Sequence, residues 1–257
     1  MSAWDDARRK IERANEHIRD IKARIVALHE TDTARVENHP KFGTERLIHE
    51  FTDTKAFDDF AVMIGDAIHN LNCALDYAWL ETAKRLVPSI ISERTKLPVR
   101  KSRDELEGWL KKPGKNIPAI LDVSPELSNF LLNDIRPYRG GNRAIWPIHV
   151  LDNIDKHRLL IPILSSVYLE GIVAVDDDGN LWPGYGFSHP MYPQKPPYVI
   201  DIDPGAKFKE YGHLTATIIV KNRQLQYGVR VPETLLDYSQ LIVKVVELFE
   251  EFVESRP

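Results

Sequence analysis

Two pairs of polar side chains in this chain have the types and spacing needed for acid–base chemistry. Asp66 and His69 stand three residues apart in one stretch, and Asn153 and His157 stand four residues apart in another. Side chains at these spacings lie on the same face of a helix. Carboxylates and imidazoles that meet between two helices are able to transfer protons to and from a bound substrate.

The first pair lies in a predicted helix over residues 57–86, which we expect at the centre of the fold because it is apolar on two sides. One arc of this helix holds Phe57, Ile64, Ile68, Leu71, Leu75, Ala78 and Trp79. The other arc combines Val62, Cys73 and Leu80 with Asp66, His69 and Asp76. We therefore expect Asp66 and His69 to be partly buried, and buried polar groups need hydrogen-bond partners.

The second pair lies in a predicted helix over residues 144–158 (AIWPIHVLDNIDKHR), in which a proline is tolerated only in the first turn. One face of this helix is formed by Trp146, Val150, Ile154 and His157, with Asn153 beside them. The sequence thus predicts that Asn153 and His157 meet Asp66 and His69 across a helix pair.

Two further helices are predicted over residues 3–29 and 233–254. The first carries an unbroken apolar stripe with steps of three and four residues, formed by Trp4, Ala7, Ile11, Ala14, Ile18, Ile21, Ile25 and Leu28. Such a stripe packs lengthwise on another helix. We expect that helix to belong to the same chain, and a homo-oligomer formed through residues 3–29 stays an alternative.

Between the helices the apolar period changes to that of strands. Strands are expected at 34–37, 46–51, 159–175, 213–220 and 225–231, with a turn near Asn222 and a proline-rich, aromatic loop over 182–204. The fold class is therefore α+β: a four-helix-bundle-like core carries a small antiparallel sheet built from inserted hairpins. Without a convincing linker or repeat, residues 1–257 are interpreted as a single domain.

Composition excludes several classes of protein. The chain has 257 residues, a net charge of −4 and one cysteine, which argues against a general nucleic-acid coat and excludes an internal disulfide or a multi-cysteine metal site. The position of Cys73 inside a helix indicates a small buried residue rather than a nucleophile. No apolar stretch is long enough to cross a membrane, so we expect a cytoplasmic protein.

Three segments of the chain resemble a family of uncharacterised bacterial proteins. They are the run GDAIHNLNCALDY at 65–77, IRPY at 135–138 and LDNIDKHRLL at 151–160. Members of that family carry Gly-Asp-x-x-His-Asn-Leu-Arg-x-Ala-Leu-Asp-His on one helix and Asp-Lys-His-Arg on another. The resemblance covers roughly residues 57–165.

In the family pattern an Arg and a His on the first helix are spaced like the motif of HEPN domains. Those domains are helical bundles, and many of them are metal-independent ribonucleases. This chain has Asn72 and Tyr77 at the two positions. The resemblance implies a HEPN-like bundle directed at RNA, either as a metal-independent ribonuclease or as a degenerate RNA binder.

In this interpretation the predicted catalytic residues are His69, His157, Asp66 and Asn153. Lys156, Arg158 and Asn70 are the predicted substrate-binding residues, with Arg158 or Lys156 holding a phosphate. Two imidazoles that titrate near neutrality, together with a cation, suffice for cleavage through the 2′-hydroxyl. No cofactor is expected.

Two other functions stay open, and so does whether the protein is an enzyme. A metal-dependent hydrolase or oxidase would use Asp66, His69 and His157 as ligands, because helical bundles bind metals through an acidic residue and a histidine one turn apart. A non-catalytic structural or sensing module would use the same polar cluster only to hold its helices together.

Overall fold

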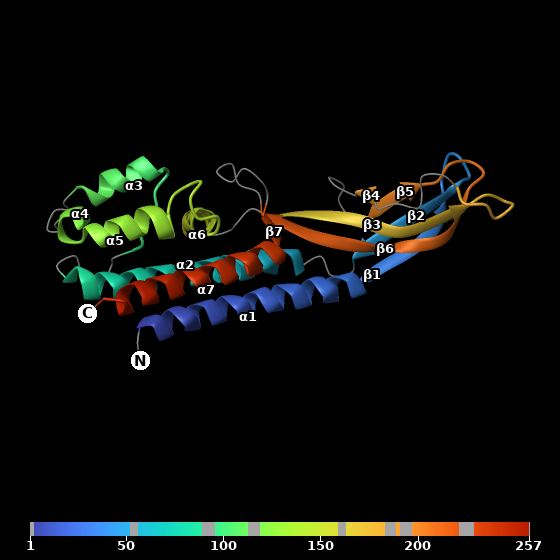
Figure 1. The fold of residues 1–257 in the computed structure, drawn as a ribbon. Helices are drawn as coiled ribbons and strands as arrows, with labels where there is room; N and C mark the ends of the chain where they lie inside the picture. The colour runs from blue at the N-terminus through green and yellow to red at the C-terminus, as the bar shows by residue number, and fades with distance from the viewer. Residues whose placement is uncertain are drawn as a thin grey trace.

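The computed structural model describes residues 3–51, 56–88, 96–112, 119–158, 163–182, 189–190, 197–220 and 229–256. Its helices are α1 (Ala3–Glu30), α2 (Ala56–Leu86), α3 (Arg103–Leu110), α4 (Ile120–Val123), α5 (Pro125–Phe130), the π-helix η2 (Leu131–Ile135), α6 (Ile145–Arg158) and α7 (Glu233–Glu254). Its strands are β1 (Asp32–Asn38), β2 (Glu45–Phe51), β3 (Ile163–Val175), β4 (His189–Pro190), β5 (Tyr198–Asp201), β6 (Lys207–Val220) and β7 (Val229–Val231). Figure 1 shows α1, α2 and α7 side by side in one half of the molecule and the strands extending into the other half.

Helix α1 packs lengthwise on α2 and α7. Every member of its predicted apolar stripe is buried: Trp4, Ala7, Ile11, Ala14, Ile18, Ile21, Ile25 and Leu28. An ion pair of 2.6 Å between Arg24 and Asp59 joins α1 to α2, and the Ser239 hydroxyl donates to Asn15 Oδ1 at 2.7 Å between α7 and α1. The stripe is therefore confirmed, and it faces the chain's own helices rather than a second copy.

Helix α2 is the central helix, because it contacts α1, α6 and α7. Its first predicted apolar arc is buried from Ile64 to Trp79, whereas the side chain of Phe57 lies outside the described residues. The second arc is not a core face throughout: Val62 is 57% exposed and Asp66 is exposed. The expectation that Asp66 is partly buried is thus wrong, because α2 turns this edge to solvent between its neighbours.

Two antiparallel sheets make up the other half of the molecule. One has the strand order β1-β2-β5 and the other has the order β4-β3-β6-β7. The long pair β3–β6 runs in register from Ile163 opposite Val220 to Val175 opposite Lys207, with one bulge at Val173/Ala174. The predicted antiparallel sheet is therefore present, although it is divided in two. The predicted turn near Asn222 and about half of the predicted loop over 182–204 lie outside the described residues. The described part of 182–204 is not only loop, because it contributes β4 and β5 to the two sheets.

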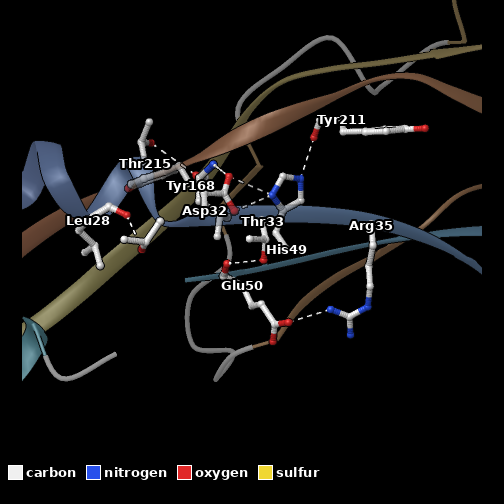
Figure 2. Close-up of polar contacts among 11 residues, drawn as sticks. Leu28, Asp32, Thr33, Arg35, His49, Glu50, Tyr168, Tyr211 and Thr215 are labelled. Atoms are coloured by element: carbon white, nitrogen blue, oxygen red, sulfur yellow. Dashed lines mark hydrogen bonds and ion pairs between the residues drawn. The ribbon is translucent and has the colours of Figure 1, made fainter. Parts of the chain in front are cut away.

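A buried histidine joins the two sheets to each other near the end of α1 (Figure 2). The His49 ring on β2 has no solvent exposure, and its Nδ1 lies 3.0 Å from Asp32 Oδ1 at the start of β1. Its Nε2 lies 2.8 Å from the backbone oxygen of Tyr211 on β6, while Asp32 Oδ2 accepts from the Leu214 amide at 2.8 Å. Because Asp32 and His49 both bond to β6, they hold the β1-β2 hairpin against the long strand pair.

The four long helices of the sequence prediction are confirmed to within a residue or two, and the mixed α and β composition is confirmed with them. The described residues contain no helix with both the length and the apolar character needed to cross a bilayer.

Candidate functional site

Helix α6 meets α2 through one buried face. The helix begins after the glycine pair at 140–141, where Asn142 Oδ1 accepts from the Ala144 amide at 2.9 Å and supplies the N-terminal cap. The face that packs toward the core consists of Ala144, Ile145, Ile148, Leu151 and Asp152. A carboxylate at the end of this apolar row must find donors on α2 or on α6 itself.

Asp152 is the centre of the polar contacts between the two helices. Its side chain is only 2% exposed, and it accepts from His69 Nδ1 at 2.9 Å and from Asn72 Nδ2 at 2.9 Å, both on α2. Lys156, one turn further along α6, donates Nζ to the same carboxylate at 2.5 Å. Three donors thus converge on one buried acceptor, which satisfies the charge that burial would otherwise penalise.

His69 connects this buried carboxylate to the surface. Its side chain is 44% exposed, and its Nε2 lies 3.4 Å from Cys73 Sγ, one turn along α2. The hydrogen bond to Asp152, followed by the contact with Cys73, raises the pKa of His69 to about 9. The ring is therefore an imidazolium at neutral pH, and both of its nitrogens donate.

Opposing influences set the ionisation of Asp152. Burial works to raise its pKa, but the hydrogen bonds from His69 and Lys156 outweigh burial, so that the pKa lies below the usual value. Asp152 is accordingly an anion at neutral pH, in keeping with the cationic His69 and Lys156.

A second imidazole belongs to the same face of α6. His149, three residues before Asp152, is half-buried, and burial lowers its pKa against the attraction of the Asp152 charge. Its Nε2 lies 3.0 Å from Asn153 Nδ2. Because an amide nitrogen only donates, His149 Nε2 is the acceptor and carries no proton.

Two further carboxylates flank this cluster. Asp155 lies against α2 at Gly65, and burial raises its pKa, with the nearby charges of Asp152 and Asp66 adding to the effect. Asp76 Oδ1 accepts from the Leu97 amide at 3.0 Å, and burial raises the pKa of Asp76 to about 6. The α2–α6 contact therefore contains several groups that titrate away from their ordinary pH.

The structure brings the two predicted helices together but pairs different residues. His69 bonds to Asp152, whereas Asn153 bonds to His149 within α6, and both Asp66 and His157 are exposed. The predicted contact of Asn153 and His157 with Asp66 and His69 is therefore wrong. The face of α6 that meets α2 differs from the predicted one by about one residue, or about 100° of rotation, because apolar residues occur on several sides of this helix.

The three predicted substrate-binding residues lie in different surroundings. Lys156 belongs to the cluster through Asp152. Asn70 is buried on the opposite side, toward α1, where it accepts from Lys10 Nζ at 3.3 Å and donates to the Asp66 backbone oxygen at 2.8 Å. The side chain of Arg158 lies outside the described residues.

Sequence reasoning missed Asp152, Asn72, His149 and Cys73 as members of the site. The sequence predicts a small buried hydrophobe at Cys73, whereas the structure has it half-buried with its thiol against an imidazole. The signal available in the sequence was the four-residue spacing of His69 with Cys73 and of Asp152 with Lys156, which places each pair on one helix face.

The ligand set of the metal alternative is not assembled. Within the described ranges, no group of three or more His, Cys, Asp or Glu side chains is placed to hold a metal ion. Of the three ligands that this alternative needs, Asp66 and His157 point to solvent and His69 is occupied by Asp152 and Cys73.

Comparisons with protein-family models, with curated proteins and with solved structures found no match for this chain.

Proposed function

We propose that the α2–α6 contact is the active site of a HEPN-like, RNA-directed protein that cleaves RNA without a metal. The observation that carries the proposal is the half-exposed imidazole of His69, held at Nδ1 by the buried Asp152 carboxylate and placed beside Lys156 through the same carboxylate. A buried carboxylate that fixes one nitrogen of an imidazole leaves the other nitrogen to exchange a proton with substrate.

His69 is the general acid in this proposal. Cleavage through the 2′-hydroxyl requires a proton for the departing 5′-oxygen. With a pKa raised to about 9 by Asp152 and Cys73, His69 carries that proton at neutral pH. The thiol contact of 3.4 Å at Nε2 is a weak hydrogen bond, which a phosphate oxygen would replace.

His149 is the general base, in place of the His157 that the sequence predicted. Burial keeps it neutral, and its unprotonated Nε2 must release the Asn153 amide before it can take the proton of a 2′-hydroxyl. Two imidazoles around one carboxylate thus have pKa values pushed in opposite directions, an arrangement that assigns one group as the acid and the other as the base.

Lys156 supplies the positive charge that a phosphodiester requires. Its side chain is 35% exposed, so its ammonium group can contact both the Asp152 carboxylate and a ligand at the surface. A fixed cation beside the acid stabilises the negative charge that develops on the phosphoryl oxygens.

A specific observation also favours the non-catalytic alternative. Asp152 is buried, and both of its oxygens accept hydrogen bonds, from His69, Asn72 and Lys156, as expected of a group that holds two helices together. In that case the cluster contributes only to stability and to the correct pairing of α6 with α2.

The test is cleavage of a labelled RNA of mixed sequence at stoichiometric protein with a chelator present. We expect products that end in a 2′,3′-cyclic phosphate, and we expect His69→Gln and His149→Gln each to slow cleavage by about 10²–10⁴-fold, the range for loss of a general acid or base. His213→Gln is the matched control, because His213 is exposed on β6 in the sheet half.

Thermal unfolding of the same variants separates the two functions. If the wild-type protein does not cleave RNA and His69→Gln has a lower Tm, the non-catalytic function is favoured, in which the cluster only holds α6 against α2. Cleavage that survives in His69→Gln at the wild-type rate would also contradict the proposal, because the acid would then be a different group.

A further inference from the structure

Two segments of the chain that pair with each other carry seven cationic side chains. Residues 96–103 contain four of them and residues 136–143 contain three, and neither segment contains an acidic residue. The Arg100 amide donates to the Pro137 oxygen at 3.0 Å, and the Arg139 amide donates to the Arg100 oxygen at 3.2 Å. Because these bonds form a parallel bridge between Arg100 and Tyr138, the two segments make one surface. We call it the cationic surface, and its cations are Lys96, Arg100, Lys101, Arg103, Arg136, Arg139 and Arg143.

Most of these cations are not used by the fold. Five of them are exposed, and among the residues that the structure describes no hydrogen bond or ion pair holds their side chains: Lys96, Lys101, Arg136, Arg139 and Arg143. Arg103 differs, because its guanidinium donates to the Leu132 oxygen at 3.0 Å and to Asn133 Oδ1 at 2.8 Å and so ties α3 to η2. The nearest acid in the chain, Glu105, accepts from the Lys101 backbone amide at 3.2 Å instead of pairing with a cation.

Arg100 is a partly buried cation that lacks a carboxylate partner. Its guanidinium lies 5.0 Å from the centre of the Trp109 ring, and its Nη1 donates to the Val99 backbone oxygen at 2.8 Å. Burial lowers the pKa of Arg100, and the charge of Glu105 opposes this effect only in part. Within the described part of the chain no acidic side chain forms an ion pair with Arg100. A charge withdrawn from water in this way is stabilised by an anion that binds from outside the protein.

The cationic surface reaches the proposed catalytic imidazoles. Burial lowers the pKa of His149, and the positive charges of Arg100, Lys156 and Lys96 lower it further, against the attraction of Asp152. Because exposed charges are largely screened beyond about 8–10 Å, Arg100 and Lys96 lie near His149. The helices that follow the two segments, α3 and α6, lie in the same half of the molecule (Figure 1).

We propose that the cationic surface binds the phosphate backbone of single-stranded RNA and positions the strand beside His69 and His149, an inference that rests on the proposed function. Two half-buried aromatic rings, Trp109 and Tyr138, lie among the cations. Proteins that bind single strands combine cations along the backbone with aromatic rings on which bases stack. Because the whole chain has a net charge of −4, RNA binds at this surface and does not coat the protein.

The test measures binding by fluorescence anisotropy with a labelled single-stranded 2′-O-methyl RNA. The proposed mechanism cannot cleave this probe, because its 2′-hydroxyl is blocked. The surface variant combines Lys101→Gln, Arg136→Gln and Arg139→Gln. We expect it to bind about tenfold more weakly than the wild-type protein. The slope of log K against log[salt] should become smaller by about 2, since each phosphate contact on a single strand contributes about 0.7.

The matched control removes the same charge from α1, which packs on α2 and α7. It combines Arg9→Gln, Arg19→Gln and Lys22→Gln, all at exposed positions. The control should bind RNA like the wild type, and both variants should keep the wild-type Tm. An equal loss of binding in the control would overturn the proposal, and so would an unchanged salt slope in the surface variant. Wild-type protein that binds vesicles of phosphatidylcholine and phosphatidylserine but not the RNA would also overturn it.

Failure of this proposal can be told apart from failure of the proposed function. If the wild-type protein binds the 2′-O-methyl RNA with the expected salt dependence but does not cleave unmodified RNA, the cationic surface is supported and the catalytic function is contradicted. If the wild-type protein cleaves RNA and the surface variant cleaves it with the same KM, the catalytic function is supported and the role of the cationic surface is overturned.

Discussion

The carboxylate of Asp155 on α6 lies directly against the α-carbon of Gly65 on α2. A Cβ added at Gly65 would stand 2.7 Å from Asp155 Oδ1 and 2.9 Å from its Cγ. The absence of a side chain at this position therefore lets α6 approach α2 closely, next to the pair formed by His69 and Asp152.

This contact predicts that Gly65→Ala destabilises the protein although alanine is the better helix former. Replacing a glycine inside a helix normally stabilises by up to about 1 kcal/mol, but here the added methyl displaces Asp155. We expect Tm to fall. Gly108→Ala is the matched control, because Gly108 lies in α3 with nothing within 4 Å of the new methyl, and Tm should rise there.

A double variant identifies the cause. If the Asp155 carboxylate is the obstacle, Gly65→Ala combined with Asp155→Ala should recover much of the lost stability. Equal losses for Gly65→Ala in the presence and absence of the Asp155 side chain would contradict this explanation.

The pair His69–Asp152 predicts a stability that depends on pH in the alkaline range. The pKa of His69 is raised by Asp152 from its ordinary 6.5 to about 9 in the folded protein. The stabilisation is therefore complete below about pH 6.5 and is lost as the pH rises toward about 9. Because the ring is 44% exposed, solvent screening limits the loss to about 1 kcal/mol.

Urea unfolding at pH 6 and pH 9 measures this effect. The wild-type protein should lose stability between the two values, and His69→Gln should show a smaller loss over the same interval. An identical loss in both proteins would mean that other groups cause the alkaline destabilisation.

Substitution of Asp76 is expected to increase the stability of the folded protein. Burial raises its pKa to about 6, above the ordinary 3.8, so the folded state holds its proton more tightly than the unfolded state does. Stability is then lost as the pH rises from about 3.8 through about 6. Asp76→Asn carries no charge and keeps an oxygen for the Leu97 amide, so at pH 8 we expect it to stabilise by about 1–2 kcal/mol.

Denaturant unfolding of the wild-type protein and of Asp76→Asn at pH 4 and pH 8 tests the direction of this pH dependence. The gain from Asp76→Asn should appear at pH 8 and be small at pH 4, where the wild-type carboxyl is protonated when folded. A destabilised variant at pH 8 would show that attraction by Lys96 and Lys156 outweighs the cost of burial.

The junction of Asp32 with His49 predicts a large loss of stability in the sheet half. Asp32→Ala removes the acceptor of the buried His49 ring and of the Leu214 amide. Each buried donor that is left without its acceptor costs about 1–3 kcal/mol. The control is Arg35→Ala on the same strand, whose ion pair with Glu50 is exposed, so its removal should change stability little.

Equilibrium unfolding compares the two variants directly. A loss for Asp32→Ala no greater than that for Arg35→Ala would contradict the bridging role that Figure 2 shows for Asp32 and His49.

Local patterns in the sequence were enough to predict the long helices, including the one that carries the site. Unbroken steps of three and four residues predicted α1, α2 and α7, and the polar residues among the apolar ones singled out the surface of α2 around His69. These features depend on local periodicity, because the apolar stripe of a long helix must face the core wherever that core lies.

Packing between the two helices sets which side of α6 faces α2, and with it the partner of His69. Apolar residues occur on several sides of α6, so its sequence does not specify which side faces α2. Rotating the helix by one residue places Asp152 where Asn153 was predicted. The rotation is set by packing: Ile145, Ile148 and Leu151 enter the core, and Asp155 fits against Gly65. Contacts between residues 80 or more positions apart depend on how two surfaces fit together, and periodicity within one helix carries no information about that fit.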